Sequence, residues 1–238
     1  DLRVVETRRR LDAHLGRLVI DGKSLDVAAI PTGMGCPSVD IVVGELLGAG
    51  ARRLLRVGTA GSLQRDIRIG DVVVASAAVR DESASDAYTD PRYPAVADPQ
   101  WVEALAMAAI TLGIDQRVHV GIVHSKDSFF GREFAQGPDA DRNAAYMARL
   151  SRSGVVASEM EAAHLFVLGS VYHRGPRTVA AIRSAAAHVR CGAVCAIVGG
   201  PEHGFASLAD EQAAEERLID LALGGVVALA RLEGVLAG

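Results

Sequence analysis

The sequence predicts an α/β fold in which a mixed, largely parallel central sheet lies between two layers of helices. Short β-branched apolar runs alternate along the chain with longer segments of helical periodicity. Half of the residues are hydrophobic but only 4% are aromatic, so Ala, Val, Leu and Ile must form the core. The 238 residues contain no recognisable interdomain linker, and we interpret them as one domain over residues 1–238.

The first predicted elements surround a glycine-rich turn. The apolar run at residues 24–31 predicts a strand, and Thr32-Gly-Met-Gly-Cys-Pro-Ser38 follows it as a turn. Residues 39–47 repeat apolar side chains at near-helical spacing, which predicts a helix that ends at Gly48. Pro37 suits the first turn of that helix, where an N–H group would have no partner.

The remaining elements continue the alternation. Apolar, β-branched runs predict strands at residues 53–57, 71–76, 117–124, 155–157 and 178–183. Helical periodicity predicts helices at residues 101–112 and 142–152, from near Ser158, and over residues 208–232 with a break considered at Gly224-Gly225. The polar residues 81–98 and the Gly-rich residues 130–142 are predicted loops, and long loops on such scaffolds usually bind substrates.

Charge and cysteine content exclude several classes of protein. Lys and Arg number 25 against 29 Asp and Glu, and this net charge of −4 does not fit a duplex-DNA or anionic-membrane partner. The longest apolar runs hold about ten residues, whereas a membrane helix needs about 20. Three cysteines and the lack of a signal-like segment favour a soluble cytoplasmic protein with reduced thiols. Because the chain begins with Asp1 rather than Met, we expect a processed or incomplete N-terminus.

The glycine turn itself is the first motif that could carry chemistry. Gly33-Met-Gly-Cys-Pro-Ser38 is similar to a shortened dinucleotide fingerprint. However, Ser38 replaces the third glycine, and Pro37 lacks the amide that a phosphate would contact. A tight structural turn between strand and helix explains the two glycines at least as well.

A cation ends a predicted buried strand in the second motif, Arg56-Val-Gly-Thr-Ala-Gly61, and a hydroxyl and two glycines follow it. Ligands of open α/β sheets collect at the carboxyl ends of strands, and a guanidinium can bind phosphate through two hydrogen bonds. Thr59 and the loop amides would add further donors. The alternative is a structural Arg that caps helix carbonyls.

Two carboxylates lie at the start of a predicted helix in Glu159-Met-Glu161. A carboxylate can accept hydrogen bonds from both hydroxyls of a ribose, but acidic residues in a first helical turn also stabilise the helix dipole. Residues two apart do not share a helix face, so we expect only one of the two to face a given pocket.

The fourth motif, His124-Ser-Lys-Asp-Ser-Phe-Phe130, follows a predicted strand. Its two phenylalanines could pack against a flat aromatic ligand, or they could fill the core. No metal site is predicted, because the seven His are scattered and the cysteines form no Cys-x-x-Cys pair. The sequence also lacks a Gly-x-Ser-x-Gly nucleophile motif.

Taken in order, these motifs resemble the nucleoside phosphorylase-I family, most closely its uridine phosphorylases. Gly70-Asp-Val-Val73 and Tyr93-Pro-Ala-Val-Ala-Asp98 add to the resemblance, which runs from about Asp21 to Phe166. It implies a pentosyltransferase of pyrimidine salvage that reversibly converts a pyrimidine nucleoside, with uridine expected, and phosphate to free base and ribose 1-phosphate.

The resemblance also implies roles for individual residues. Phosphorolysis passes through an oxocarbenium-like sugar, so the site must hold an anion beneath the anomeric carbon, anchor the hydroxyls and stabilise the departing base. The implied catalytic residues are Arg56, Thr59 and Glu161. The implied ligands are Arg56, Thr59 and Arg9 for phosphate, Thr59, Met160 and Glu161 for ribose, and Gly61, Phe129, Gln136 and Arg132 for the base.

Two of these assignments leave alternatives open. A phosphate-binding Arg donated by a neighbouring subunit falls, by spacing, among Arg8, Arg9 and Arg10. In the family a Gln and an Arg two residues later bind the pyrimidine, but here Pro138 stands two residues after Gln136. Arg132 and Arg142 are the competing substitutes for that Arg.

The resemblance further implies a homodimer or higher homo-oligomer whose active sites are shared across the interface. It implies no cofactor, and inorganic phosphate is a co-substrate. Whether a cation binds at the subunit interface near Ser38 is left open. The expected partners are the small-molecule nucleoside and phosphate, with neither nucleic acid nor membrane.

Two alternatives compete with this function. The first is a purine nucleoside phosphorylase or a hydrolytic nucleosidase of the same fold. Residues 182–188 lack the carboxylate that purine-specific relatives carry after the late strand, which favours pyrimidines. The second is a non-catalytic nucleoside-binding protein, because the sequence contains no counterpart of the family's Gly-Asp-Pro phosphate loop or of its upstream ribose-binding His.

Overall fold

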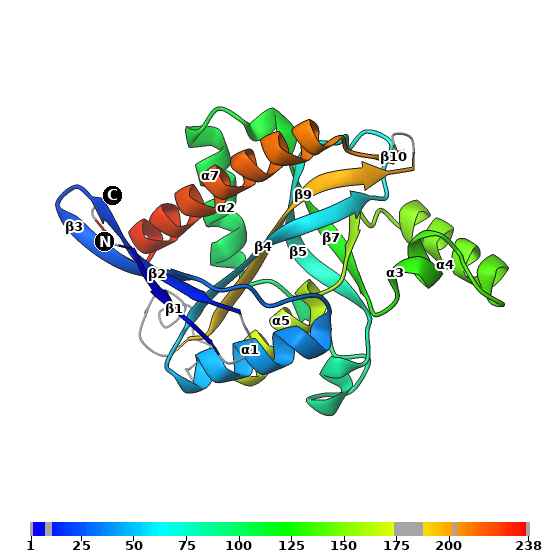
Figure 1. Ribbon diagram of the computed structural model, residues 1–238, viewed down its shortest axis with the longest axis horizontal. Coiled ribbons are helices and arrows are strands. Elements are labelled where there is room, and N and C mark those ends of the chain that lie inside the picture. Colours follow the sequence, from blue (N-terminus) through cyan, green and yellow to red (C-terminus); the bar gives the residue numbers. More distant parts are fainter. Residues whose placement is uncertain (1, 8–10, 174–187, 202–203, 237–238) are drawn as a thin grey trace.

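The computed structural model describes residues 2–7, 11–173, 188–201 and 204–236. A seven-stranded sheet in the order β10-β9-β4-β8-β7-β5-β6 forms its centre (Figure 1). Its strands are β4 (Arg53–Ser62), β5 (Val72–Asp81), β6 (Ala95–Val96), β7 (Val118–Lys126), β8 (Ala157–Glu159), β9 (Arg190–Gly200) and β10 (Gly204–Phe205).

An additional pairing between β5 and β9 closes five of these strands into a ring. The pairs β4–β9, β5–β7 and β7–β8 are parallel, whereas β4–β8 and β5–β9 are antiparallel. In the antiparallel closure, Val72 at the start of β5 lies opposite Ala196 in β9. The sheet is therefore mixed, as predicted, but the closure of the ring was not predicted.

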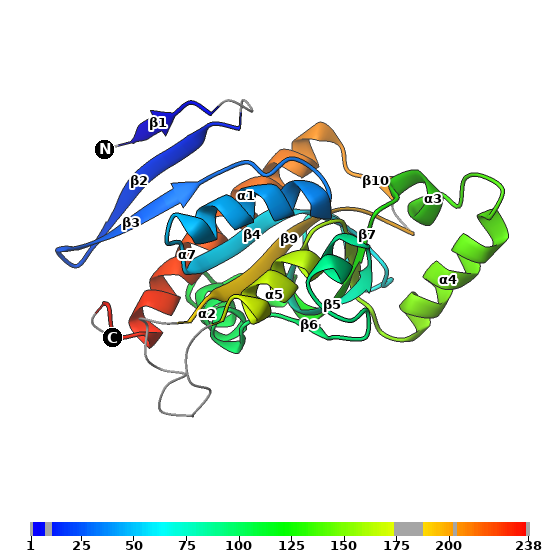
Figure 2. The same ribbon diagram turned by 90° about the horizontal axis from the view of Figure 1, so that it is seen from below.

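Helices cover both faces of this sheet (Figures 1 and 2). α1 (Cys36–Gly48) and α5 (Ala162–Val171) pack on one face, where Val43 and Phe166 belong to one buried apolar cluster. α2 (Pro99–Thr111) and α7 (Leu208–Leu232) pack on the other, around a second buried cluster. This arrangement confirms the predicted fold class. No helix in the described part of the chain is long and apolar enough to cross a membrane.

Smaller elements extend from the two ends of the molecule (Figure 2). At one end lie α3 (Phe129–Glu133) and α4 (Ala140–Arg152). At the other lies a separate three-stranded sheet of β1 (Arg3–Val5), β2 (Ala13–Ile20) and β3 (Lys23–Ala29). Two short 3₁₀ turns, η1 (Ala84–Ala87) and η2 (Asp115–Arg117), complete the elements of the described residues.

Most of the predicted elements are confirmed with shifts of a few residues at their ends. The strand predicted at residues 155–157 is β8, two residues later, and α7 runs unbroken through Gly224-Gly225. The predicted loop at residues 81–98 contains η1 and β6, and the predicted loop at residues 130–142 contains most of α3. The strand predicted at residues 178–183 lies outside the described residues, and β9 was missed.

Glycine allows α7 to approach α2 closely. A Cβ atom at Gly225 would lie 2.6 Å from Leu105 Cδ2 and 3.2 Å from Leu105 Cγ, and Leu105 is fully buried. We expect Gly225→Ala to lower the free energy of unfolding by about 1–3 kcal/mol because the packed core must shift. Urea denaturation at equilibrium measures this change.

Gly44, in the interior of α1, provides the matched control. A Cβ atom there would meet nothing within 4 Å. Gly44→Ala should therefore raise the free energy of unfolding by roughly 0.5–1 kcal/mol through helix propensity alone. Equal changes in the two variants would contradict the close approach of α7 to α2.

Candidate active site

Arg56, within β4, lies against two carboxylates at the start of α5. Its Nε donates to Glu161 Oε2 at 3.1 Å, and its Nη2 contacts the same oxygen. Nε also lies 3.2 Å from Glu159 Oε2. The three side chains are between 0% and 15% exposed. One buried cation thus lies between two buried anions. A protein core does not need such a charged cluster for its stability.

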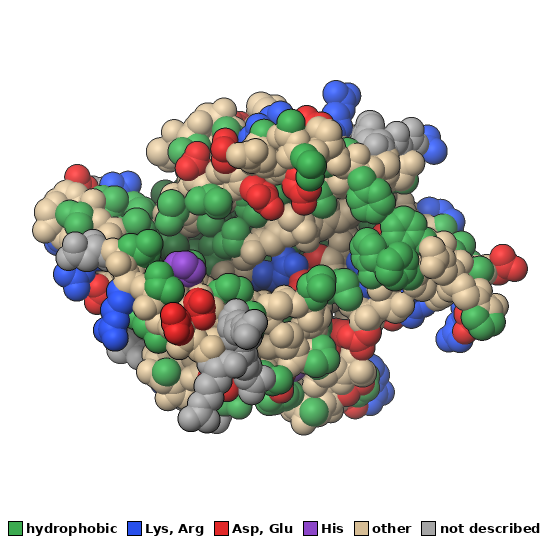
Figure 3. All heavy atoms as spheres, in the orientation of Figure 1, with side chains coloured by type: hydrophobic (Ala, Val, Ile, Leu, Met, Phe, Trp, Pro, Cys, Tyr) green, Lys and Arg blue, Asp and Glu red, His purple; other side chains and the backbone are tan. Residues whose placement is uncertain are grey.

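The position of Arg56 depends on Gly58. A Cβ atom at Gly58 would lie 2.6 Å from Arg56 Nη1, so only glycine lets the guanidinium lie along the strand. The expectation that Arg56 ends a strand is wrong, because β4 continues through Gly58 and Gly61 to Ser62. In the orientation of Figure 1, the molecular surface is hollowed where β4 runs between α1 and α7 (Figure 3).

The backbone at the β8–α5 junction fixes the two carboxylates. Glu159 Oε2 accepts from the N–H groups of Glu161 and Ala162, each at 2.9 Å, and Ser125 donates its hydroxyl to Glu159 Oε1. Glu161 Oε1 accepts from the Gly35 N–H at 2.6 Å. Glu159 therefore caps the first turn of α5, and the glycine turn positions Glu161.

Contrary to the sequence prediction, the two carboxylates do not lie within a helix. Glu159 ends β8, and Glu161 is the residue that precedes the first turn of α5. Both side chains reach Arg56.

Neighbouring groups keep the Arg56 guanidinium protonated despite its burial. Burial acts to lower the pKa of Arg56, but Cys195, Glu159 and Glu161 outweigh it and raise that pKa above its ordinary value. Arg56 Nη1 donates to Cys195 Sγ at 2.9 Å. Burial raises the pKa of the Cys195 thiol to about 11, although Arg56 acts to lower it, so the thiol is neutral at pH 7. Each terminal nitrogen of Arg56 keeps a second N–H that can bind an anion.

The structure does not bring Thr59 into this cluster. Thr59 is exposed, and its hydroxyl makes no hydrogen bond with the described part of the chain. Because side chains alternate along a strand, it leaves β4 on the opposite face from Arg56. Met160 is half-buried, and its carbonyl accepts from Cys36 Sγ at 3.2 Å. Gly61 pairs with Ser158 of β8, directly before the two glutamates.

Four of the five phenylalanines form an aromatic cluster on α3, the residue after it, and β10: Phe129, Phe130, Phe134 and Phe205. Phe129 lies 5.4 Å from Phe130 and 5.3 Å from Phe134 between ring centroids, and Phe134 lies 5.9 Å from Phe205. All four are between 39% and 66% exposed, and hydrophobic side chains gather at this end of the molecule (Figure 3). They do not fill the core, so their faces can contact a ligand.

Arg132 is bound within the chain. Its Nε donates to Asp81 Oδ2 at 2.6 Å and its Nη2 to Asp81 Oδ1 at 2.7 Å. Behind Asp81, His124 is fully buried and lies 3.0 Å from both Asp81 Oδ2 and Ser158 Oγ. Burial acts to raise the pKa of Asp81, but hydrogen bonds from His124 and Arg132 outweigh it and hold that pKa below its usual range. Arg132 thus anchors α3 to β5.

A second ion pair holds the neighbouring residue of α3. Lys126 is 2% exposed, and its Nζ lies 2.6 Å from Glu133 Oε1. Nζ also donates to Ser158 Oγ at 2.8 Å and lies 5.8 Å from the Phe129 ring centroid. Two ion pairs of opposite polarity therefore attach α3 to β5 and β7. Sequence reasoning missed this network, although Lys126 near the end of a predicted strand was its signal.

A family model described as "Phosphorylase superfamily" matches residues 1–224. The chain belongs to this superfamily. The sequence prediction of the family is therefore confirmed. The molecule combines a cation held between buried carboxylates with a separate, exposed aromatic cluster. With such an arrangement a phosphorylase can bind phosphate, sugar and base.

Curated phosphorylases resemble this chain over most of its length. "Uridine phosphorylase" of Thermococcus kodakarensis is 37% identical over 202 residues, which cover 83% of this chain and 65% of that protein. "Guanosine phosphorylase" of Halorubrum lacusprofundi is 34% identical, covering 88% and 78%. "Uridine phosphorylase" of Treponema pallidum is 36% identical, covering 78% and 66%. The chain thus spans just under two thirds of the length of each of these two uridine phosphorylases.

Several expected ligand residues of the phosphorylase lie apart from the Arg56 cluster. Gln136 is exposed, and its backbone N–H donates to the Phe130 carbonyl at 3.2 Å. Arg142 is 82% exposed, on α4. Arg8, Arg9 and Arg10 lie outside the described residues. Ser38 donates its hydroxyl to the Thr32 carbonyl, and the described residues contain no group of three potential His, Cys, Asp or Glu metal ligands.

Proposed function

We propose that this phosphorylase superfamily member catalyses the reversible phosphorolysis of a pyrimidine nucleoside, uridine, to free base and ribose 1-phosphate. The observation that carries the proposal is Arg56, buried between Glu159 and Glu161 with N–H donors to spare. The relatives named uridine phosphorylase support it. The protein would serve pyrimidine salvage as a pentosyltransferase.

In this proposal the cluster supplies complementary charge to the reacting sugar. Arg56 holds phosphate while a phosphate oxygen bonds to the anomeric carbon and the bond from that carbon to the base breaks. The electron pair of the broken bond stays on the base nitrogen, which takes up the proton that phosphate loses. Glu161 accepts from the ribose hydroxyls, and Met160 packs against the sugar.

The aromatic cluster provides the base subsite in this proposal. Phe129 packs on the pyrimidine, with Gly61 and Gln136 near its polar edge. Arg132 acts through the placement of α3, since its guanidinium binds Asp81 on both oxygens. The two ion pairs of α3 therefore fix the distance between the base and the ribose carboxylate.

We further propose a cytoplasmic homo-oligomer in which Arg9 of a neighbouring subunit reaches the phosphate. The supports are the order of the motifs and the match to the superfamily model. We propose no cofactor, with inorganic phosphate as the co-substrate.

Uridine conversion with and without phosphate tests the proposal. We expect uracil release only when phosphate is present, with one ribose 1-phosphate formed for each uracil, because phosphate is the nucleophile. Chromatography of base and sugar phosphate measures both products. Uracil release without phosphate would indicate a nucleosidase, and binding of uracil without turnover would indicate a non-catalytic binding protein.

A purine substrate is the second candidate. In the described part of the chain the last long strand of the sheet is β9, and residues 182–188 precede it. After β9 the sequence continues Pro201-Glu202, where Glu202 lies outside the described residues. The relative named guanosine phosphorylase favours the same candidate. Assays of inosine and guanosine beside uridine decide between the purine and pyrimidine candidates. The measure is the ratio of the kcat/KM value for each purine nucleoside to that for uridine.

A further inference from the structure

A pocket separate from the Arg56 cluster lies between α3 and α4. It has a volume of about 400 Å³ and is lined by Arg132, Arg142, Ala145, Tyr146 and Arg149. The pocket shares no residue with the Arg56 cluster.

One stripe of α4 forms most of this pocket. Residues 142, 145, 146 and 149 follow the spacing i, i+3, i+4 and i+7, which places them on one face of the helix. In a helix that packs on the core, such a stripe would be apolar and buried. Here it is Arg-Ala-Tyr-Arg, and Leu150 is the one buried residue of α4.

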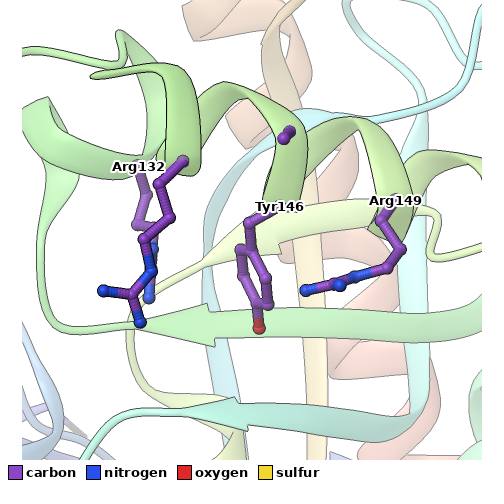
Figure 4. Close-up of a pocket in the computed structure, with 5 residues that line it drawn as sticks. Arg132, Tyr146 and Arg149 are labelled. Carbon is purple, nitrogen blue, oxygen red and sulfur yellow. The ribbon is translucent and has the colours of Figure 1, made fainter. Parts of the chain in front are cut away.

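Two guanidinium groups lie against the ring of Tyr146. Figure 4 shows Tyr146 between Arg132 and Arg149, with the three side chains on the same side of the pocket. The Cζ atoms of Arg132 and Arg149 lie 4.5 and 5.4 Å from the Tyr146 ring centroid. The cation–π contact orients the Arg149 guanidinium and leaves its N–H donors open. The guanidinium of Arg132 donates instead to Asp81 and Asn143.

The pocket carries an excess of positive charge. Asp81 neutralises Arg132, but the carboxylate nearest Arg142 is Asp139 at a distance of 3.9 Å, and both side chains are exposed. Arg149 makes no ion pair with any described residue. No acidic residue lines this pocket. Like charges repel when they are gathered, and an anion bound between them would remove that repulsion.

We propose that this pocket binds the phosphate group of a phosphomonoester such as a nucleoside 5′-monophosphate. Arg142 and Arg149 donate to the phosphate oxygens, and the Tyr146 hydroxyl adds a donor. The volume falls in the range of small-molecule sites, about 300–1,000 Å³, and leaves room for the sugar beside Ala145. The proposal does not depend on the proposed catalytic function.

Titration calorimetry with uridine 5′-monophosphate tests this site. We expect Arg149→Ala to weaken binding roughly tenfold or more, because one charge-assisted contact is lost. Arg152→Ala is the matched control, since Arg152 lies on the same helix and does not line the pocket. Both residues are exposed, so equal melting temperatures of the two variants establish intact folding.

The comparison has two decisive outcomes. Weaker binding in Arg149→Ala than in Arg152→Ala, with uridine binding equal in both, assigns the phosphate to this pocket. Equal affinities in the two variants would overturn the proposal, because the nucleotide would then bind elsewhere or through general attraction. Uridine turnover, measured separately, tests the catalytic proposal independently of this result.

Discussion

Replacement of Arg56 by alanine is expected to raise the phosphate concentration for half-maximal rate at least tenfold. A charge-assisted hydrogen bond contributes about 1.5–3 kcal/mol, and Arg56 is proposed to make such bonds to phosphate. The same change should lower the free energy of unfolding by about 3–5 kcal/mol, because Glu159 and Glu161 would remain buried without their cation. Phosphate titrations of the initial rate and urea denaturation measure the two effects.

Arg190 provides a matched control for the loss of stability. It is 2% exposed on β9 and pairs with Asp98 at 2.9 Å and Glu233 at 2.8 Å, away from the Arg56 cluster. Arg190→Ala should lower stability by a similar amount and leave the phosphate dependence unchanged. If Arg56→Ala showed an unchanged phosphate dependence as well, Arg56 would be a structural residue. Assays below the melting temperature of each variant keep the comparison valid.

Glu161→Gln is expected to lower kcat/KM for uridine by about ten- to a hundredfold, with a smaller effect on the phosphate dependence. The carboxylate is proposed to accept from the ribose hydroxyls, and an amide is a weaker, uncharged acceptor. Initial rates with uridine and 2′-deoxyuridine measure the effect. The wild-type preference for uridine should shrink in the variant, because the 2′-hydroxyl has then lost its acceptor.

Glu233→Gln is the control for removal of a buried carboxylate. Glu233 accepts from Arg53 at 2.7 Å and from Arg190 at 2.8 Å, and its side chain is 6% exposed. Its replacement should reduce stability without changing the ratio of rates for the two nucleosides. A ratio that stays constant in Glu161→Gln would remove Glu161 from the ribose subsite.

Local patterns predicted most of the fold. Periodicity placed α1, α2, α4 and α7 because each helix depends on neighbours in sequence. The β5–β9 closure could not be predicted from such patterns, because it joins segments that are distant in sequence. The hairpin of β2 and β3 was overlooked, although its turn residues Asp21 and Gly22 both have positive φ, and Asp-Gly is a strong hairpin signal.

The candidate site was predictable only in part. Motif order identified Arg56 and Glu161, whose contact with each other the structure shows. The role of Glu159 was missed because the helix was expected to begin too early. The network of Asp81, His124, Lys126 and Ser158 joins the ends of three strands that local sequence does not relate. Its residues are ordinary polar types, and only the register of β5, β7 and β8 brings them together.

The ring of five strands also bears on how the chain folds during synthesis. β9 is the last of the ring strands to be made, yet it pairs with both β4 and β5. Until residues 190–200 leave the ribosome, β4 and β5 each present an open edge that can pair with another chain. Contacts this distant in sequence form slowly, so the nascent chain passes through a period of high aggregation risk that ends only when β9 inserts.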